Sequence, residues 1–151
     1  MELPGGTPAE KADFRDNLIA DIANIEQGMR IALIGVVNPL IAAIRKRGGT
    51  CLPCDLQMER TQWGDPVEKD MEKVLDSADG VICTGMTLSN GTFDRVVERV
   101  LERNIPLTVY AQTGSAVAAR FVGNGITSLL AESFPFSQFS ANATRVFCYK
   151  G

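Results

Sequence analysis

Residues 31–36 read Ile-Ala-Leu-Ile-Gly-Val, and this continuous apolar run decides the fold class. Strands of a parallel sheet are covered on both faces, so they are apolar throughout instead of alternating with polar residues. The dipeptide Asn38-Pro39 follows with the signature of a helix start, and Gly48-Gly49 marks the end of that helix. The stretch therefore predicts a buried strand followed by a crossover helix.

Strands and helices alternate along the rest of the chain, which predicts a parallel sheet built from right-handed crossovers. Further strands are expected at residues 50–56, 80–84, 107–110, 126–130 and 145–149. Pro53 makes the strand at 50–56 an edge strand, because proline cannot donate to a central ladder. We therefore predict a three-layer, doubly wound, Rossmann-like α/β fold with strand order 2-1-3-4-5 and a sixth strand at the far edge.

Capping residues predict the remaining helices. Thr7-Pro8-Ala9-Glu10 forms a capping box, and an apolar stripe after it runs from Phe14 to Met29. Asp65-Pro66 has the same signature before the third strand. A helix is expected over residues 92–103, with a buried face made of Phe93, Val96, Val97, Val100 and Leu101. We expect the chain to divide into an N-terminal helix (1–29) and one compact Rossmann-like unit (30–151).

Composition and charge narrow the classes of partner. The 151 residues carry a net charge of −3 and no long basic run, so no nucleic-acid partner is expected. No segment reaches the roughly 20 apolar residues of a membrane span, and the first ten residues lack the pattern of a signal peptide. We expect a cytoplasmic protein with reduced cysteines. The chain has no histidine, which excludes Ser-His-Asp and Cys-His catalysis and imidazole zinc sites.

A ligand site is expected where the strand order reverses, beyond the carboxyl ends of the first and third strands. Three loops there lead into helix N-termini, whose free N–H groups favour anions. Asp55 ends the second strand, where an acidic residue can bind a ribose diol. The predicted ligand is a small anionic or nucleotide-like molecule. The candidate binding residues are Gly35, Asn38, Asp55, Thr84, Gly85, Thr87, Asn90, Gly91, Thr92, Gln112, Thr113, Gly114 and Ser115.

Several of these residues also have a purely structural interpretation. Gly35 suits a tight strand-to-helix turn, Asn38 suits a helix cap, and Asp55 suits a solvated strand end. The loop at 85–92 is the more specific signal, because it holds four hydroxyl or amide side chains and two glycines within eight residues. An ordinary connection of this kind needs only about two to six residues.

The cysteines do not form a recognisable metal motif. Cys51 and Cys54 lie three apart on a predicted strand, so their side chains should point to opposite faces. Cys83 and Cys148 are isolated in apolar strands, where a thiol behaves as a small hydrophobe. We predict no metal site; an approach of Cys54 to Cys83 near the strand ends is the variant that stays open.

Aromatic residues in predicted loops indicate a contact surface. Trp63 and the segment 134–139 could form lids over the site or a subunit contact, and we favour the contact. A homodimer is therefore expected. Asp94, in the first turn of a predicted helix, suits the positive end of the helix dipole.

Residues 81–94 read Val-Ile-Cys-Thr-Gly-Met-Thr-Leu-Ser-Asn-Gly-Thr-Phe-Asp, and they resemble the motif of the putative heavy-metal chelation family of bacterial and archaeal proteins. The turn at 38–40 and the loop at 112–116 fall where that family has its corresponding loops, so the resemblance covers about residues 30–130. It implies a Rossmann-like domain whose loops face a shared pocket. Typical members carry an enolase-N-terminal-like domain before this one, and the family is associated with anaerobic cobalamin synthesis. The pocket residues that the resemblance implies are Thr84, Gly85, Thr87, Asn90, Gly91 and Thr92.

Three functions follow from these patterns. The first is a small-molecule-binding domain linked to metal or cobalamin-type cofactor metabolism, and it is our main prediction. The second is an enzyme of that metabolism, which without histidine would use Asp55, Asp94 or Tyr110 as acid or base. The third is a metal-handling or scaffold protein without catalysis, binding metal through Cys54 and Cys83. The sequence identifies neither a reaction nor a cofactor.

Overall fold

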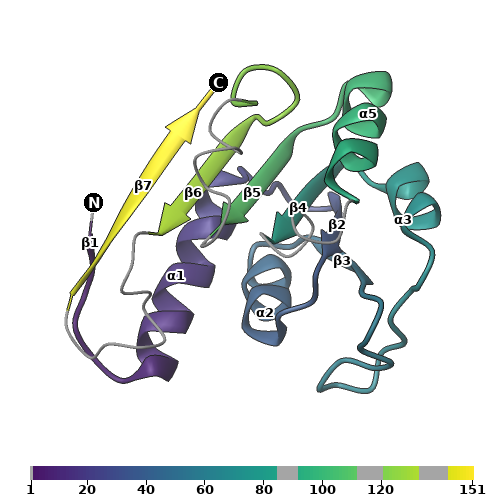
Figure 1. Ribbon diagram of the computed structural model, residues 1–151. Coiled ribbons are helices and arrows are strands. Elements are labelled where there is room, and N and C mark those ends of the chain that lie inside the picture. The colour runs from purple at the N-terminus through teal and green to yellow at the C-terminus, as the bar shows by residue number, and fades with distance from the viewer. Residues whose placement is uncertain (1, 85–91, 112–120, 133–142) are drawn as a thin grey trace.

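A seven-stranded mixed β-sheet runs through the molecule, with helices packed against it (Figure 1). The computed structural model describes residues 2–84, 92–111, 121–132 and 143–151. The strands are β1 (Glu2–Leu3), β2 (Arg30–Ile34), β3 (Thr50–Cys54), β4 (Gly80–Thr84), β5 (Leu107–Ala111), β6 (Ser128–Glu132) and β7 (Thr144–Lys150). The helices are α1 (Pro8–Ile22), α2 (Asn38–Lys46), α3 (Met71–Ser77) and α5 (Phe93–Arg103).

The strand order is β1-β7-β6-β5-β4-β2-β3. Strands β2 to β6 are parallel, whereas β7 is antiparallel to both β6 and β1. The expectation of a wholly parallel sheet was therefore wrong, and so was the placing of β7 at the edge. The connection over residues 133–143 is shorter than the dozen or more residues that a parallel crossover needs. The two-residue β1, which is too short to give a sequence signal, pairs with β7 beyond it.

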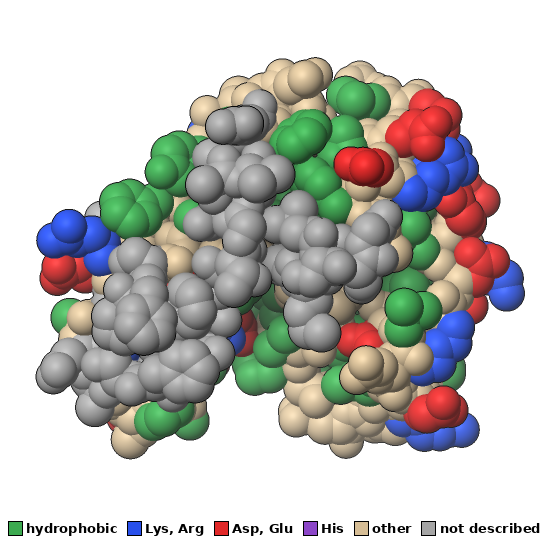
Figure 2. All heavy atoms as spheres, in the orientation of Figure 1, with side chains coloured by type: hydrophobic (Ala, Val, Ile, Leu, Met, Phe, Trp, Pro, Cys, Tyr) green, Lys and Arg blue, Asp and Glu red, His purple; other side chains and the backbone are tan. Residues whose placement is uncertain are grey.

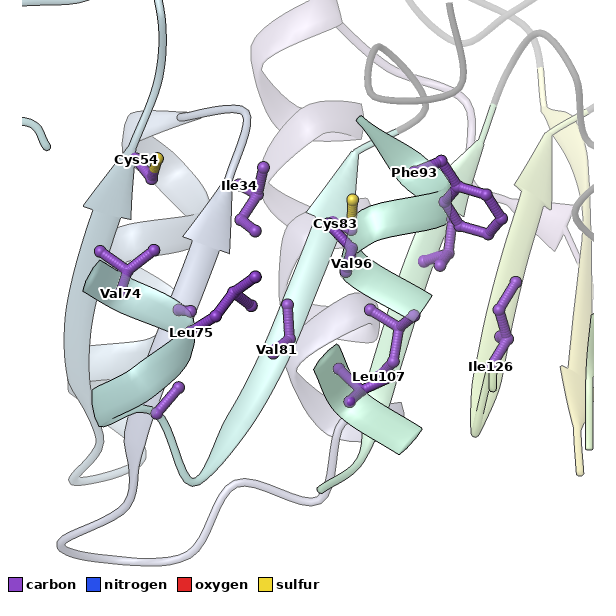
Figure 3. Close-up of a cluster of buried hydrophobic side chains, with 14 of the residues drawn as sticks. Ile34, Cys54, Val74, Leu75, Val81, Cys83, Phe93, Val96, Leu107 and Ile126 are labelled. Carbon is purple, nitrogen blue, oxygen red and sulfur yellow. The ribbon is translucent and has the colours of Figure 1, made fainter. Parts of the chain in front are cut away.

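Helices cover both faces of the sheet. Residues Ile31 and Leu33 of β2 belong to the buried cluster that includes α1 and α2. Residues Ala32 and Ile34 point the other way, into the cluster that includes α3 and α5 (Figure 3). The unbroken apolar run of β2 follows from this double burial, as the sequence predicted.

Ion pairs join α3 to α5 on the outer face of the molecule, where acidic and basic side chains alternate (Figure 2). Arg95 Nε lies 2.5 Å from Glu72 Oε1, and Arg99 pairs with Asp76. Such exposed pairs add little to stability, because water screens both charges. Arg103 does more, because it donates to the carbonyl of Ala78 at 2.7 Å and also to that of Leu75, and so satisfies the end of the short helix α3.

The first helix confirms one prediction and overturns another. The capping box of Thr7 and Glu10 is present. However, α1 ends at Ile22, because Asn24 adopts a left-handed conformation with φ of 52°. Phe14, expected on the buried stripe, is 44 % exposed. The rest of the stripe, Leu18, Ile22, Ile25 and Met29, packs against the buried cluster of α1 and α2 as predicted, although Ile25 and Met29 lie beyond the end of the helix.

The segment before α3 was also predicted wrongly. Asp65-Pro66 does not begin a helix; α3 begins at Met71, with Asp70 as its N-cap. Instead the chain runs along the outside of β3, where the Glu68 N–H donates to the Pro53 carbonyl at 2.9 Å. This segment covers part of the edge strand. Leu101, expected on the buried face of α5, is 56 % exposed.

None of the helices in the described part of the chain combines the length and apolarity required to cross a membrane.

Candidate functional site

The carboxyl ends of β2 and β4 lie side by side where the strand order reverses. From there the chain turns into α2 on one face of the sheet and, after β4, into α5 on the other. We call the ends of β2 to β6 the carboxyl edge. Three predicted site residues come together at it, namely Gly35, Asp55 and Thr84, and Thr92 stands at the start of α5.

Gly35 is required both by its backbone and by its neighbour. Its φ of 84° lies in the left-handed region that side chains with a Cβ rarely adopt. A Cβ at this position would also overlap the hydroxyl oxygen of Thr84, which is itself buried. The tight turn foreseen from the sequence is therefore present, and it brings β2 and β4 into close contact at their ends.

Asp55 organises the loops at this edge. Its carboxylate accepts hydrogen bonds from the N–H groups of Val36 at 3.0 Å, Gln57 at 2.8 Å and Met58 at 3.3 Å. Burial raises the pKa of Asp55, but these three donors and the charge of Lys69 lower it, and the net result is a pKa below the ordinary value of 3.8. The carboxylate is therefore ionised at neutral pH and fixed in place.

This arrangement changes the interpretation of the first loop. A negative charge already lies against the Val36 N–H at the start of α2, so a phosphate there would meet electrostatic repulsion. Asn38 was predicted as a possible cap, but Val37 occupies the N-cap position. The Asn38 side chain instead accepts a hydrogen bond from the Gln62 N–H at 3.1 Å. Asn38 thus positions a neighbouring loop.

A buried polar cluster continues the carboxyl edge beyond β4. Tyr110 pairs with Thr84 across β4 and β5, and its hydroxyl donates to Glu132 at the end of β6 at 2.5 Å. Arg15 of α1 makes a cation–π contact with Tyr110, with its guanidinium carbon 5.0 Å from the centre of the ring. Glu132 is 2 % exposed, so this hydrogen bond is shielded from water.

Asp16, also in this cluster, is a buried carboxylate with only one of its two oxygens bonded to a described residue. Arg15 Nε lies 3.0 Å from Asp16 Oδ1, but no donor among the described residues reaches Asp16 Oδ2. Burial raises the pKa of Asp16 above its ordinary value, and the charge of Arg15 only partly opposes this. Burial lowers the pKa of Arg15, yet Asp16, Tyr110 and Glu132 outweigh it and the net pKa is raised.

Sequence reasoning named Tyr110 but missed Lys11, Arg15, Asp16 and Glu132. Lys11 and Asp16 are buried on the same side of α1 as the apolar Ile19. Charged residues at the spacing of a buried helix face were the available signal.

Eight of the predicted site residues lie outside the described residues, as does the aromatic segment 134–139. They are Gly85, Thr87, Asn90, Gly91, Gln112, Thr113, Gly114 and Ser115. Trp63 is described; it is 45 % exposed and stacks on Arg45, whose guanidinium carbon lies 4.8 Å from the ring centre.

Two open grooves lie away from the carboxyl edge. One of about 310 Å³ runs beside β3 and is lined by residues that include Leu52 and Val74. The other, of about 240 Å³, lies by Asn104 and Gly125, at the opposite end of the strands. Both are open. The groove beside β3 includes the ion pair of Lys73 with Glu68 at 3.8 Å, whereas the described residues that line the groove near Asn104 include no charged side chain. Neither groove lies where the strand order reverses.

The chain matches a protein-family model described as "Putative heavy-metal chelation" (DUF364) over residues 18–129. Two solved structures of this family are similar. One, from Desulfitobacterium hafniense, is 15% identical with a TM-score of 0.66, and the match covers 90% of this chain and 57% of that chain. The other, from Pyrococcus horikoshii, is 16% identical with a TM-score of 0.64, and the match covers 82% of this chain and 54% of that chain.

The same fold occurs in an enzyme of known activity. LysN, an α-aminoadipate aminotransferase from Thermus thermophilus, is 13% identical with a TM-score of 0.60, and the match covers 93% of this chain and 39% of that chain. A comparison with curated proteins found no similar sequence. The chain thus spans little more than half the length of its family's solved structures, which are described as proteins of unknown function. It belongs to the DUF364 family, described as putative heavy-metal chelation proteins.

Proposed function

We propose that this chain is a Rossmann-like domain that binds a small nucleotide-like molecule at the carboxyl edge, in the service of metal or cobalamin-type cofactor metabolism. The observation that carries the proposal is the state of Asp55. Its carboxylate is ionised, is held by three backbone N–H groups, and stands beside the point where the strand order reverses.

Asp55 retains the capacity to accept a further hydrogen bond. A carboxylate offers about four acceptor positions, of which Val36, Gln57 and Met58 use three. The remaining position on Oδ2 suits a hydroxyl donor, and a ribose diol is the hydroxyl pair that acidic residues at this strand end bind in dinucleotide-binding folds. A hydrogen bond from such a hydroxyl to a carboxylate is worth about 1.5–3 kcal/mol.

The anionic part of the ligand belongs elsewhere in this proposal. Because Asp55 faces the start of α2, we place the anionic group over the first turn of α5, next to Thr84 and Thr92. The loops 85–91 and 112–115 remain proposed contacts on the strength of their sequence.

The test compares adenosine with 2′,3′-dideoxyadenosine by isothermal titration calorimetry. Wild-type protein should bind adenosine about tenfold or more tightly, because only adenosine can donate to Asp55. Asp55→Asn should remove that preference. Asp79→Asn is the matched control, since Asp79 accepts a backbone hydrogen bond from Arg30 at 2.8 Å but lies at the opposite end of the strands.

Equal affinity of the wild type for the two nucleosides would contradict the role of Asp55. The role of Asp55 would also be contradicted if Asp79→Asn lost as much adenosine binding as Asp55→Asn, because both losses would then reflect general destabilisation. No measurable binding of either nucleoside would contradict the ligand class itself.

The proposal includes no reaction. Asp94 is exposed on α5, and Tyr110 already donates to Glu132, so neither is placed as an acid or base by its surroundings. We further propose a cytoplasmic homodimer. Native mass spectrometry at low micromolar concentration should then show twice the 16.3 kDa chain mass, and a purely monomeric spectrum would contradict it.

A further inference from the structure

The family is described by heavy-metal chelation, which requires several donor side chains close enough to bind one ion. Proteins bind ions such as Zn²⁺, Ni²⁺ and Cd²⁺ chiefly through thiolates, imidazoles and carboxylates, whereas the methionine thioether is a weak ligand that suits softer ions such as Cu(I). The chain has no histidine, and the segments 85–91, 112–120 and 133–142 contain no cysteine, aspartate or glutamate. All cysteine, aspartate and glutamate side chains therefore lie in the described part of the chain, in which no three of them come close enough to share an ion.

Cys54 and Cys83 were the pair to consider, and they do not approach one another. Both residues pair with Ile34, one from each side of β2. Their strands are thus two spacings apart, about 9–10 Å, whereas two Zn–S bonds of about 2.3 Å need the sulfur atoms within about 4 Å. The side chain of Ile34 stands between the two cysteines (Figure 3). The approach left open by the sequence is therefore wrong.

Each remaining thiol is isolated. Cys51 lies on the opposite face of the sheet from Cys54, in the cluster under α1 and α2, as predicted. Burial raises the pKa of Cys51 to about 12 and that of Cys54 to about 11, so forming either thiolate at neutral pH is unfavourable. Cys148 is exposed on β7, three strands from β4.

Carboxylates do surround Cys54, but each already holds backbone groups. Asp55, Glu68 and Asp70 all raise the pKa of Cys54 by repelling its thiolate. Glu68 accepts from the N–H groups of Lys69 at 3.0 Å and Asp70 at 3.1 Å. Asp70 caps α3 through the Glu72 N–H at 3.0 Å, and Asp55 holds the three donors described above. These bonds fix the carboxylates in positions where, within the described part of the chain, no three metal donors come close enough to share an ion.

We infer that this chain does not chelate a free heavy-metal ion with its own side chains, in contrast to the description of its family. Any metal that it handles must be coordinated by donors from another molecule, whether a small organic ligand or a partner protein. The inference rests on donor positions and does not depend on the proposed nucleotide-like ligand.

The test is a competition between metal-free full-length protein and a colorimetric chelator for Zn²⁺, Ni²⁺ and Cd²⁺. We expect the chelator to keep all three metals in the presence of either wild-type protein or Cys148→Ser. The second variant removes the exposed thiol, which could capture a soft ion with one bond without forming a chelate. If wild-type protein retains Cd²⁺ and Cys148→Ser does not, the ion is bound by the single exposed thiol. That result agrees with the inference, because one bond is not a chelate.

About one equivalent of any of these metals retained by Cys148→Ser would overturn it. Adding Cys54→Ser to that background would then show whether the buried thiol and its surrounding carboxylates form the site. Because the readout is metal retained by folded protein, its outcome is distinct from that of the nucleoside titration.

Discussion

Single residues at the carboxyl edge act through backbone geometry as much as through side-chain chemistry. Gly35 was foreseen as a turn glycine because it follows a buried strand and precedes a helix start. Its contact with Thr84 was not foreseeable, since the two residues are far apart in the chain and meet only when β2 and β4 pair. Asp55 was foreseen as a site residue, but its three backbone partners were not.

Replacing Gly35 tests this contact. Gly35→Ala should lower the free energy of unfolding by about 2–4 kcal/mol, because an unfavourable φ and an overlap with Thr84 add together. Gly64→Ala is the matched control: Gly64 has a φ of 87° but no heavy atom within 4 Å of the added Cβ. It should cost only about 1 kcal/mol. Equal costs in urea unfolding would show that the overlap is relieved by a shift of Thr84.

Asp16 should make stability depend on pH. Its pKa in the folded protein is raised above the ordinary value of 3.8, so the folded state binds more protons than the unfolded state in that range. The contribution of Asp16 to wild-type stability should therefore fall as pH rises from about 3.8 through the folded-state pKa. Asp16→Asn should not share this loss, and its stability relative to wild type should increase with pH.

The measurement is chemical unfolding at a series of pH values. Asp94→Asn, exposed on α5, controls for the change in charge. A difference between Asp16→Asn and wild type that stays constant or shrinks with rising pH would contradict the assigned burial of Asp16.

Among the elements, buried strands were the easiest to predict and the charged helix was the hardest. β4 has the predicted bounds, Gly80–Thr84, because a strand between two others is apolar throughout. For α1 the capping box fixed the start, but the apolar stripe continued to Met29, past the observed end at Ile22, and did not indicate that Lys11 and Asp16 are buried. Residues 65–69 carry a helix-start signature, yet pairing with the edge of β3 overrides it.

The capping box of α1 should contribute measurably to stability. Glu10 N–H donates to the Thr7 hydroxyl at 3.2 Å, and the Glu10 carboxylate accepts from the Thr7 N–H at 2.8 Å. Thr7→Ala should lower the free energy of unfolding by about 1 kcal/mol. Thr7→Ser keeps the oxygen and should stay close to wild type. If Thr7→Ser is destabilised as much as Thr7→Ala, the methyl group and not the cap is responsible.

At the scale of the whole molecule, the alternation of strands and helices predicted the α/β class and the position of the candidate site. The reversal of β7 was missed because the predicted strand ends left a longer connection than the structure has, and β1 was missed because its pairing with β7 is long-range. Charged residues on the buried side of α1 could be read from the sequence, but their meeting with Tyr110 and Glu132 could not, because it depends on how α1 packs on the sheet. The resulting edge runs from Asp55 to Glu132 and combines fixed acceptors with a buried cation.

NMR chemical-shift mapping with adenosine would locate the nucleotide-like ligand proposed for this edge. The perturbed backbone amides should cluster at Val36, Asp55, Thr84 and the first turn of α5. Perturbations centred on the groove beside β3 or on the one near Asn104 would contradict the proposal, as would a spectrum that adenosine leaves unchanged.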